Sequence, residues 1–197
     1  MPKVNVNELL YQALETEIGG VLVYRTAIRC AVNEDLKHEW KNYLEQTEHH
    51  VESVTALMRT VGVDPATDTP VRQVCRHIAA SLVQAMQMAL AAGPPEAAQI
   101  VAAECVTQAE TKDHLNWELL GLAAEQMEGP AAEAIMAAYE EVEEEEDEHL
   151  YHTTGWTREL WVASLGLPAV LPPPEEAKDV KTAIGAARAK QDREQML

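Results

Sequence analysis

A carboxylate and an imidazole stand three residues apart in the C-terminal half of the chain, at Glu146 and His149. Steps of four and three residues stay on one face of an α-helix, because about 3.6 residues make a turn. The face through this pair contains Ile135, Tyr139, Val142, Glu146, His149, Thr153, Trp156 and Leu160. A helix that buries this face buries both polar side chains, which is costly unless something compensates the charge. A metal ion is one such compensation, and Glu-x-x-His on an inward helix face is typical of metal sites in helical bundles.

The pair lies within an acidic run, EVEEEEDEHLYH, at residues 141–152. Most glutamates of such a run are expected on a solvated helix face, so a metal site needs further ligands from elsewhere in the chain.

The first expected helix, from about Asn5 or Asn7 to Ala31, supplies one such ligand. Its apolar face is interrupted by Glu17, and Tyr24 follows seven residues later on the same face. A buried and unpaired glutamate is rare, so we predict that Glu17 binds metal and that Tyr24 is a catalytic neighbour. The alternative is that Glu17 reaches water at the edge of this face.

The second expected helix follows Asn33 and ends near Gly62. Its apolar residues place Thr47 and His50 inward, with Glu48 on the flank. We predict His50 and Glu48 as metal ligands; the alternative is that His50 is a hydrogen-bonded residue of an ordinary core.

The helix that Pro94 and Pro95 are expected to begin, and that reaches about Met127, has two candidate inward faces. One contains Ala103, Val106, Glu110, Asp113, Trp117 and Leu120; the other contains Val101, Cys105, Gln108, Lys112, Leu115 and Leu119. The first face predicts Glu110 and Asp113 as metal ligands, with His114 in reserve, although Gln99 extends it with a polar residue. The second face places Lys112 inward, where it would supply a cation to Glu146.

The amino-acid composition limits which folds and which binding partners are possible for this chain. The 197 residues contain no alternating apolar and polar strands, which predicts an all-α protein. The formal net charge of −18 argues against binding to nucleic acid or to an anionic membrane. Three widely separated cysteines and no apparent signal peptide favour a cytoplasmic protein with reduced thiols.

The helix expected from Pro70 to Gly93 has an ordinary apolar face, so we expect it to be structural.

Three stretches resemble the ferritin-like superfamily, and within it the stress-associated bacterial proteins of the YciE and YciF type. They are DLKHEWKNYLEQTEHHVESVTALM at residues 35–58, the helix from Pro70, and QAETKDHLNWELLG at residues 108–121 followed by the acidic helix. The resemblance implies a ferritin-like four-helix bundle at residues 1–166, with an additional short helix between its two hairpins. It also implies a cytoplasmic homodimer. Residues 167–197 are expected to form a Pro-rich spacer and an amphipathic or partly disordered tail.

The chain departs from this family at three positions. The family tends to have an acid where this chain has Gln46, related di-iron proteins have a glutamate at Thr47, and Asn116 falls on an acid position. One metal ion or an asymmetric pair therefore remains as open as a complete two-metal site.

The predicted function is metal-dependent redox chemistry with oxygen or peroxide, using one or two iron or manganese ions per chain. Hard carboxylates together with imidazole suit these metals. The predicted ligands are Glu17, Glu48, His50, Glu110, Asp113, Glu146 and His149. The alternatives are a metal-free helical stress or scaffold protein with a decayed metal site, and an interaction module in the apolar segment LWVASLGLPAVL.

Overall fold

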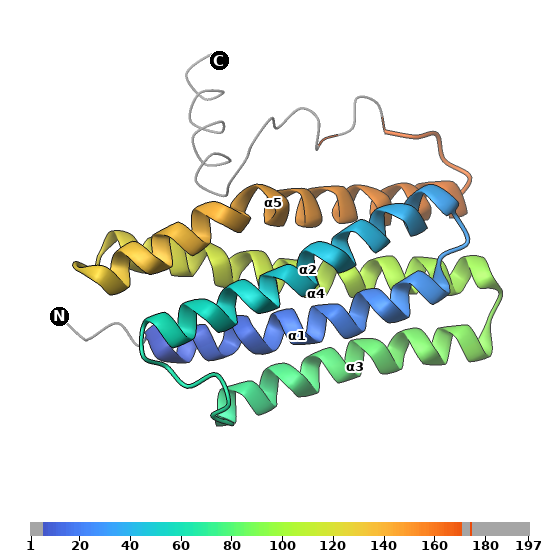
Figure 1. Cartoon of the computed structure of the whole chain (residues 1–197). Helices are drawn as coiled ribbons and strands as arrows, with labels where there is room; N and C mark the ends of the chain where they lie inside the picture. The colour runs from blue at the N-terminus through green and yellow to red at the C-terminus, as the bar shows by residue number, and fades with distance from the viewer. Residues whose placement is uncertain (1–5, 171–173, 175–197) are drawn as a thin grey trace, which may run out of the picture.

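The computed structural model describes residues 6–170 and Pro174, and all regular structure in this part of the chain is helical. Its five helices are α1 (Val6–Cys30), α2 (Glu34–Thr60), α3 (Pro70–Ala92), α4 (Pro95–Glu125) and α5 (Pro130–Ser164) (Figure 1). The prediction of an all-α fold is therefore confirmed.

The helices begin where the sequence provides capping residues. The side chain of Asn33 accepts hydrogen bonds from the backbone N–H groups of Asp35 and Leu36, and so caps α2. Thr69 caps α3 in the same way through the N–H of Arg72. Proline occupies the first helical residue of α3, α4 and α5, where it costs no intrahelical hydrogen bond.

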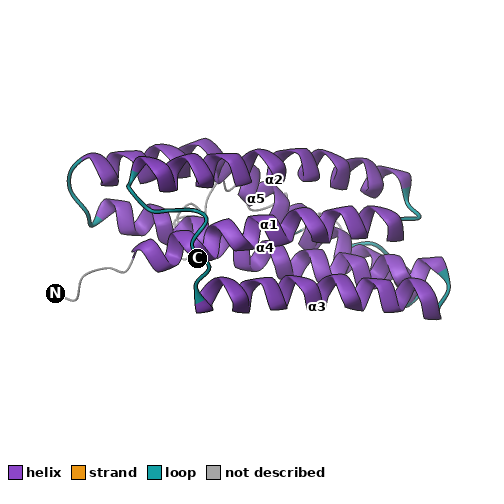
Figure 2. Cartoon of the chain, turned by 60° about the horizontal axis from the view of Figure 1, so that its bottom comes forward, coloured by secondary structure: helices purple, strands orange, loops and turns teal. Residues whose placement is uncertain are grey.

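Four of the helices pack as two antiparallel hairpins, α1 with α2 and α4 with α5, and α3 carries the chain from one hairpin to the other. Because α3 spans the whole length of the bundle, α2 and α4 point in the same direction (Figure 1). Both views place α3 outside α1 and α4, which are the helices that it contacts (Figure 2).

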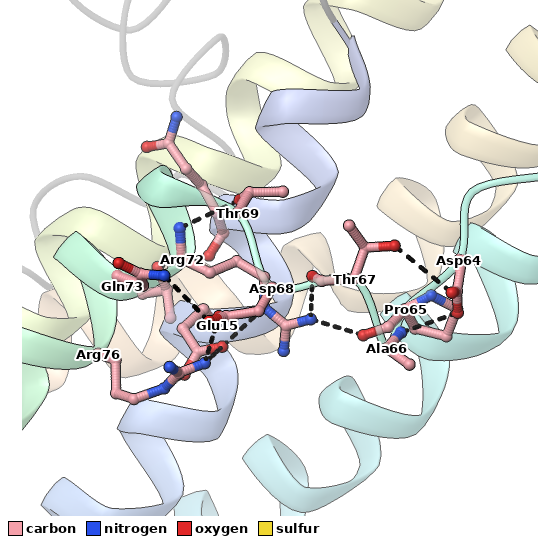
Figure 3. A network of polar contacts seen from close by, with 12 residues as sticks. Glu15, Asp64, Pro65, Ala66, Thr67, Asp68, Thr69, Arg72, Gln73 and Arg76 are labelled. Atoms are coloured by element: carbon pink, nitrogen blue, oxygen red, sulfur yellow. Dashed lines mark hydrogen bonds and ion pairs between the residues drawn. The ribbon is translucent and has the colours of Figure 1, made fainter.

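Helix α3 has 23 residues, almost as many as the 25 of α1, so the expectation of a short additional helix is wrong. An ion-pair network holds its first turns (Figure 3). The buried Glu15 carboxylate accepts hydrogen bonds from Nε of Arg72 and Nε of Arg76, both at 2.8 Å. Further along, a Cβ added at Gly19 would lie 2.6 Å from the Cβ of Ala79, so only glycine allows α1 and α3 to approach this closely.

The core consists of two apolar clusters at different heights of the bundle. One includes Leu10, Val54, Leu120 and Ile135; the other includes Ala27, Trp40, Met86, Ala102 and Val106. On each of the four bundle helices, the residues predicted as inward metal ligands fall between the segments that form these two clusters. The bundle therefore has a polar layer at mid-height between two apolar layers.

Of the expected C-terminal spacer, only residues 167–170 and Pro174 belong to the described part, and the expected tail from residue 175 lies outside it. None of the described helices is both long enough and apolar enough to cross a membrane.

Candidate metal centre

Six ionisable side chains from all four bundle helices meet in the polar layer, and each is at most 3% exposed. They are Glu17 of α1, His50 of α2, Glu110 and Asp113 of α4, and Glu146 and His149 of α5. All six belong to the set of ligands predicted from the sequence.

The Glu146 carboxylate is the centre of the cluster. Its Oε1 lies 3.0 Å from Nδ1 of His50 and 3.9 Å from Nδ1 of His149. The same Nδ1 of His50 is 3.6 Å from Oε1 of Glu17, and that of His149 is 3.5 Å from Oε2 of Glu110. Glu146 belongs to two groups whose ligand atoms lie within 4.8 Å of one another, one with both imidazoles and one with Glu17 and Asp113.

Hydrogen bonds on the outer side of each imidazole fix its orientation. The Nε2 atom of His50 donates to Oε2 of Glu145 at 2.8 Å, and Nε2 of His149 donates to Oε1 of Gln46 at 3.0 Å. Since the outer nitrogen carries a proton in this arrangement, Nδ1 is the ring nitrogen that faces the cluster and is the one that could bind a metal ion. An acceptor on the outer nitrogen is also what orients metal-binding histidines in other proteins.

Every residue of the cluster keeps a buried atom without a hydrogen-bond partner. These atoms are Oε2 of Glu17, Nδ1 of His50, Oε2 of Glu110, Oδ1 of Asp113, Oε2 of Glu146 and Nδ1 of His149. Buried polar atoms are normally satisfied, but none of these six atoms has a hydrogen-bond partner within the described residues. The cluster therefore requires protons or a cation.

Burial and mutual repulsion raise the pKa values of the Glu17, Asp113 and Glu146 carboxyl groups. Loss of hydration is the largest cause at Glu17, Asp113 and Glu146, and the charges of neighbouring carboxylates add to it. The pKa of Glu146 rises to about 8. Within the described residues, the only basic groups within 4 Å of the cluster carboxylates are His50 and His149.

Two aromatic side chains border the cluster. Trp117 donates a hydrogen bond from Nε1 to Oε1 of Glu17 at 2.7 Å. Tyr24 is fully buried with its ring centroid 6.1 Å from that of His149. Burial, together with the charge of Glu110, raises the pKa of Tyr24, so its hydroxyl keeps its proton at neutral pH.

Thr47 occupies the helical position where a second Glu-x-x-His motif would have its acid. Its hydroxyl donates to the carbonyl oxygen of Tyr43 at 2.8 Å, and its methyl group Cγ2 lies 3.2 Å from where a Cβ on Gly20 would be. Oδ2 of Asp113 is 3.9 Å from that same point. Asp113 of α4 thus supplies a carboxylate close to where α2 lacks one, and the cluster contains four carboxylates.

Glu48 and His114 lie outside the cluster. Glu48 is on the surface, where its Oε1 is 2.6 Å from NH2 of Arg25. A flank position on α2 faces solvent because α5 covers only the face that contains His50. His114 pairs with Asp147 instead, at 2.7 Å between Nε2 and Oδ1.

The first of the two faces considered for α4 is the buried one. The polar residue at one end of this face is Gln99. Its burial is explained by two hydrogen bonds, which its Oε1 accepts from the N–H groups of Val32 and Asn33 in the α1–α2 turn. Asn116 is fully buried, but it bridges two helices: Oδ1 accepts a hydrogen bond from Nζ of Lys112, and Nδ2 donates to Oγ1 of Thr16 at 3.0 Å.

The outer partners Gln46 and Glu145 were not found from the sequence. Each precedes an inward position, Thr47 or Glu146, by one residue, so a search for inward faces assigns both to the flank. One feature could have identified them: a metal-binding imidazole needs a hydrogen-bond acceptor for the ring nitrogen that does not bind the metal.

Two hollows lie beside the cluster. A crevice of about 10 Å³, close to the minimum for one water molecule, is lined by Glu146, Trp117 and Glu143 between α4 and α5. A hollow of about 320 Å³ lies over the outer side of the imidazoles and is lined by Asn42, Glu45, Gln46, His49 and Glu145. Of the six cluster residues, only Glu146 lines one of these two hollows.

Comparison of the chain with family models, with curated proteins and with solved structures finds no match. The class that fold and site define is a five-helix bundle with a buried carboxylate and imidazole cluster that could hold a metal ion.

The raised pKa values predict how the stability of protein stripped of divalent cations depends on pH. Glu146 keeps its proton up to about pH 8 when folded but loses it near the ordinary value of 4.5 when unfolded. The folded state thus binds more protons, so the free energy of unfolding should fall as pH rises through this window, by up to about 1.4 kcal/mol per pH unit for each such group.

Urea unfolding in chelator at pH 6 and pH 7.5 measures this slope, and Glu146→Gln should make it shallower. A stability that is constant or rises between these pH values would contradict the assignment of buried, protonated carboxyl groups.

Proposed function

We propose that the cluster binds a pair of iron or manganese ions and uses them for redox chemistry with oxygen or peroxide. The observation that carries this proposal is the set of six buried ligand atoms without a hydrogen-bond partner within the described residues. Four carboxylates balance the charge of two divalent cations, and carboxylates with imidazole are the ligands that iron and manganese accept.

The distances suggest how the ligands divide between two ions. Glu17 and Asp113 would join His50 at one ion, since Nδ1 of His50 is 3.6 Å from Glu17, and Glu17 and Asp113 form one group with Glu146. Glu110 would join His149 at the other, at 3.5 Å. Glu146 contacts both imidazoles and would bridge the two ions. The second set has fewer protein ligands, so its ion would have more room for an oxidant.

The chain path supports membership of the ferritin-like superfamily. Ferritin-like bundles pair two hairpins through one long crossover, so that the second and third bundle helices point the same way. Here α3 makes that crossover, and the pairs Glu146 with His149 and Thr47 with His50 occupy equivalent steps on the last helix of each hairpin.

Bound iron or manganese would supply reversible one-electron oxidation at the cluster. The chain's own residues would hold the ions in a dry layer, orient both imidazoles through Glu145 and Gln46, and keep a phenolic proton beside Glu110 at Tyr24. Because this hydroxyl keeps its proton next to Glu110, Tyr24 is available as a donor of a proton or an electron.

The metal-free alternative required Lys112 to neutralise Glu146. In the structure Nζ of Lys112 donates to Asn116 instead, which counts against a bundle that balances its buried acids with lysine. The homodimer and the cytoplasmic location remain proposals that rest on the resemblance. Three exposed leucines on one side of α4, Leu115, Leu119 and Leu122, support a subunit contact that sedimentation velocity would detect.

Metal content tests the proposal. Protein purified without chelator, or loaded with ferrous ion without oxygen, should contain about two ions per chain by elemental analysis. The double variant Glu146→Gln, His149→Ala should lose them and, without metal, be at least as stable as the parent, because it removes uncompensated buried charge.

The matched control is Glu48→Gln, His49→Ala, which removes one carboxylate and one imidazole from the exposed side of α2. It should keep the metal. Equal metal content in both double variants, or none in the parent after loading, would contradict the proposal.

The role of Tyr24 predicts a separation of binding from chemistry. Tyr24→Phe removes only the hydroxyl and should leave the metal content unchanged, but it should slow the oxidation of ferrous-loaded protein by peroxide roughly tenfold or more. Stopped-flow absorbance measures this rate. Tyr11→Phe, at the far end of the same helix, should be without effect, and an unchanged rate in Tyr24→Phe would remove this residue from the chemistry.

A further inference from the structure

A groove of about 330 Å³ lies between α1, α3 and α4, within the size range of small-molecule pockets. Its walls are mainly apolar and include Val23, Ile78 and Leu82. Gly20 lines the groove, and a Cβ on the same residue would point towards Thr47 and Asp113. The groove and the candidate metal centre therefore lie on either side of one glycine of α1.

Lys112 is the only basic side chain among the residues that line this groove. Its ammonium group has three donors, and its hydrogen bond within the described residues goes to the neutral amide of Asn116. No carboxylate of the described part forms an ion pair with it. Arg29, Lys41 and Arg59 also form no ion pair in the described residues, but they are exposed, whereas Lys112 is half-buried.

The polar side chains of the groove other than Lys112 already have hydrogen-bond partners in the protein, including Thr107, whose Oγ1 is 2.8 Å from Oγ1 of Thr157 in α5. The hydroxyl of Thr16 donates to the carbonyl of Gln12, and that of Thr111 to the carbonyl of Thr107. The amide of Gln108 donates to the carbonyl of Glu104. Apart from Lys112, the groove thus offers an incoming molecule a surface of methyl and methylene groups.

We propose that this groove binds a free medium-chain carboxylate, with its head group on Lys112 and its alkyl chain along Val23, Ile78 and Leu82. A cation with spare donors at an apolar surface complements an anion with an apolar tail. The groove extends along α1 from Thr16 to Val23, seven residues or about 10 Å of helix, which suits a chain of this length. That the carboxylate is also a substrate of the metal centre rests on the proposed function; its binding does not.

Isothermal titration calorimetry of the full chain with decanoate and with decanol, both below their aggregation concentrations, tests this proposal. The parent should bind decanoate roughly tenfold more tightly than decanol, the effect of one charge-assisted hydrogen bond. Lys112→Gln should abolish this preference, whereas Lys41→Gln, an exposed lysine on α2, should keep it. Ile78→Asp should weaken both ligands, and Met88→Asp, an exposed residue of α3 outside the groove, neither.

Elemental analysis and circular dichroism of the same samples keep this test separate from that of the metal centre, because neither Lys112 nor Ile78 belongs to the ligand set. Binding of decanoate by a protein without metal would support the groove and refute only the redox proposal. No binding, or equal preference in the parent and Lys112→Gln, would overturn the groove proposal. So would dissociation of a dimer by Ile78→Asp, which would make the groove a contact between copies of the chain.

Discussion

Repulsion among four buried carboxyl groups is the constraint on which the rest of this structure depends. Glu17, Glu110, Asp113 and Glu146 share a volume from which water is excluded, and the described residues supply no lysine or arginine to neutralise them. Such a layer is stable only with protons or with a cation. In the metal-free protein, the raised pKa values of Glu17, Asp113 and Glu146 mean that these groups keep protons, and divalent ions would replace these protons. The same feature thus makes the layer costly to fold and well suited to bind metal.

The architecture limits this cost to one height of the bundle. Apolar clusters above and below pack as ordinary helical cores, with Ile135 at one end and Trp40 at the other. Outer acceptors hold the imidazoles of His50 and His149 with Nδ1 inward, so little reorganisation is needed when an ion arrives. Helix α3 takes no part in the layer, but it closes the crossover and forms one wall of the apolar groove beside it.

The sequence predicted the helices and the inward ligands because both follow from the period of the α-helix. An inward face can be followed through Glu17, His50 and Glu146 without knowing how the helices pack. Flank positions cannot be assigned this way, since their exposure depends on the neighbouring helix. Glu48 was therefore predicted as a ligand although it pairs with Arg25 on the surface, while Glu145, expected in solvent, orients His50. The choice between the two faces of α4 also needed tertiary structure, because Lys112 turns to Asn116 and the groove.

Anomalous X-ray diffraction from crystals of the metal-loaded protein, collected on both sides of the iron or manganese absorption edge, tests the central claim most directly. The account predicts anomalous density in the polar layer within about 2 Å of Glu146 and of Nδ1 of His50 or His149, a distance typical of protein ligands to transition metals. A layer without anomalous density in loaded crystals, with its carboxyl groups hydrogen-bonded to one another or to water, would contradict it.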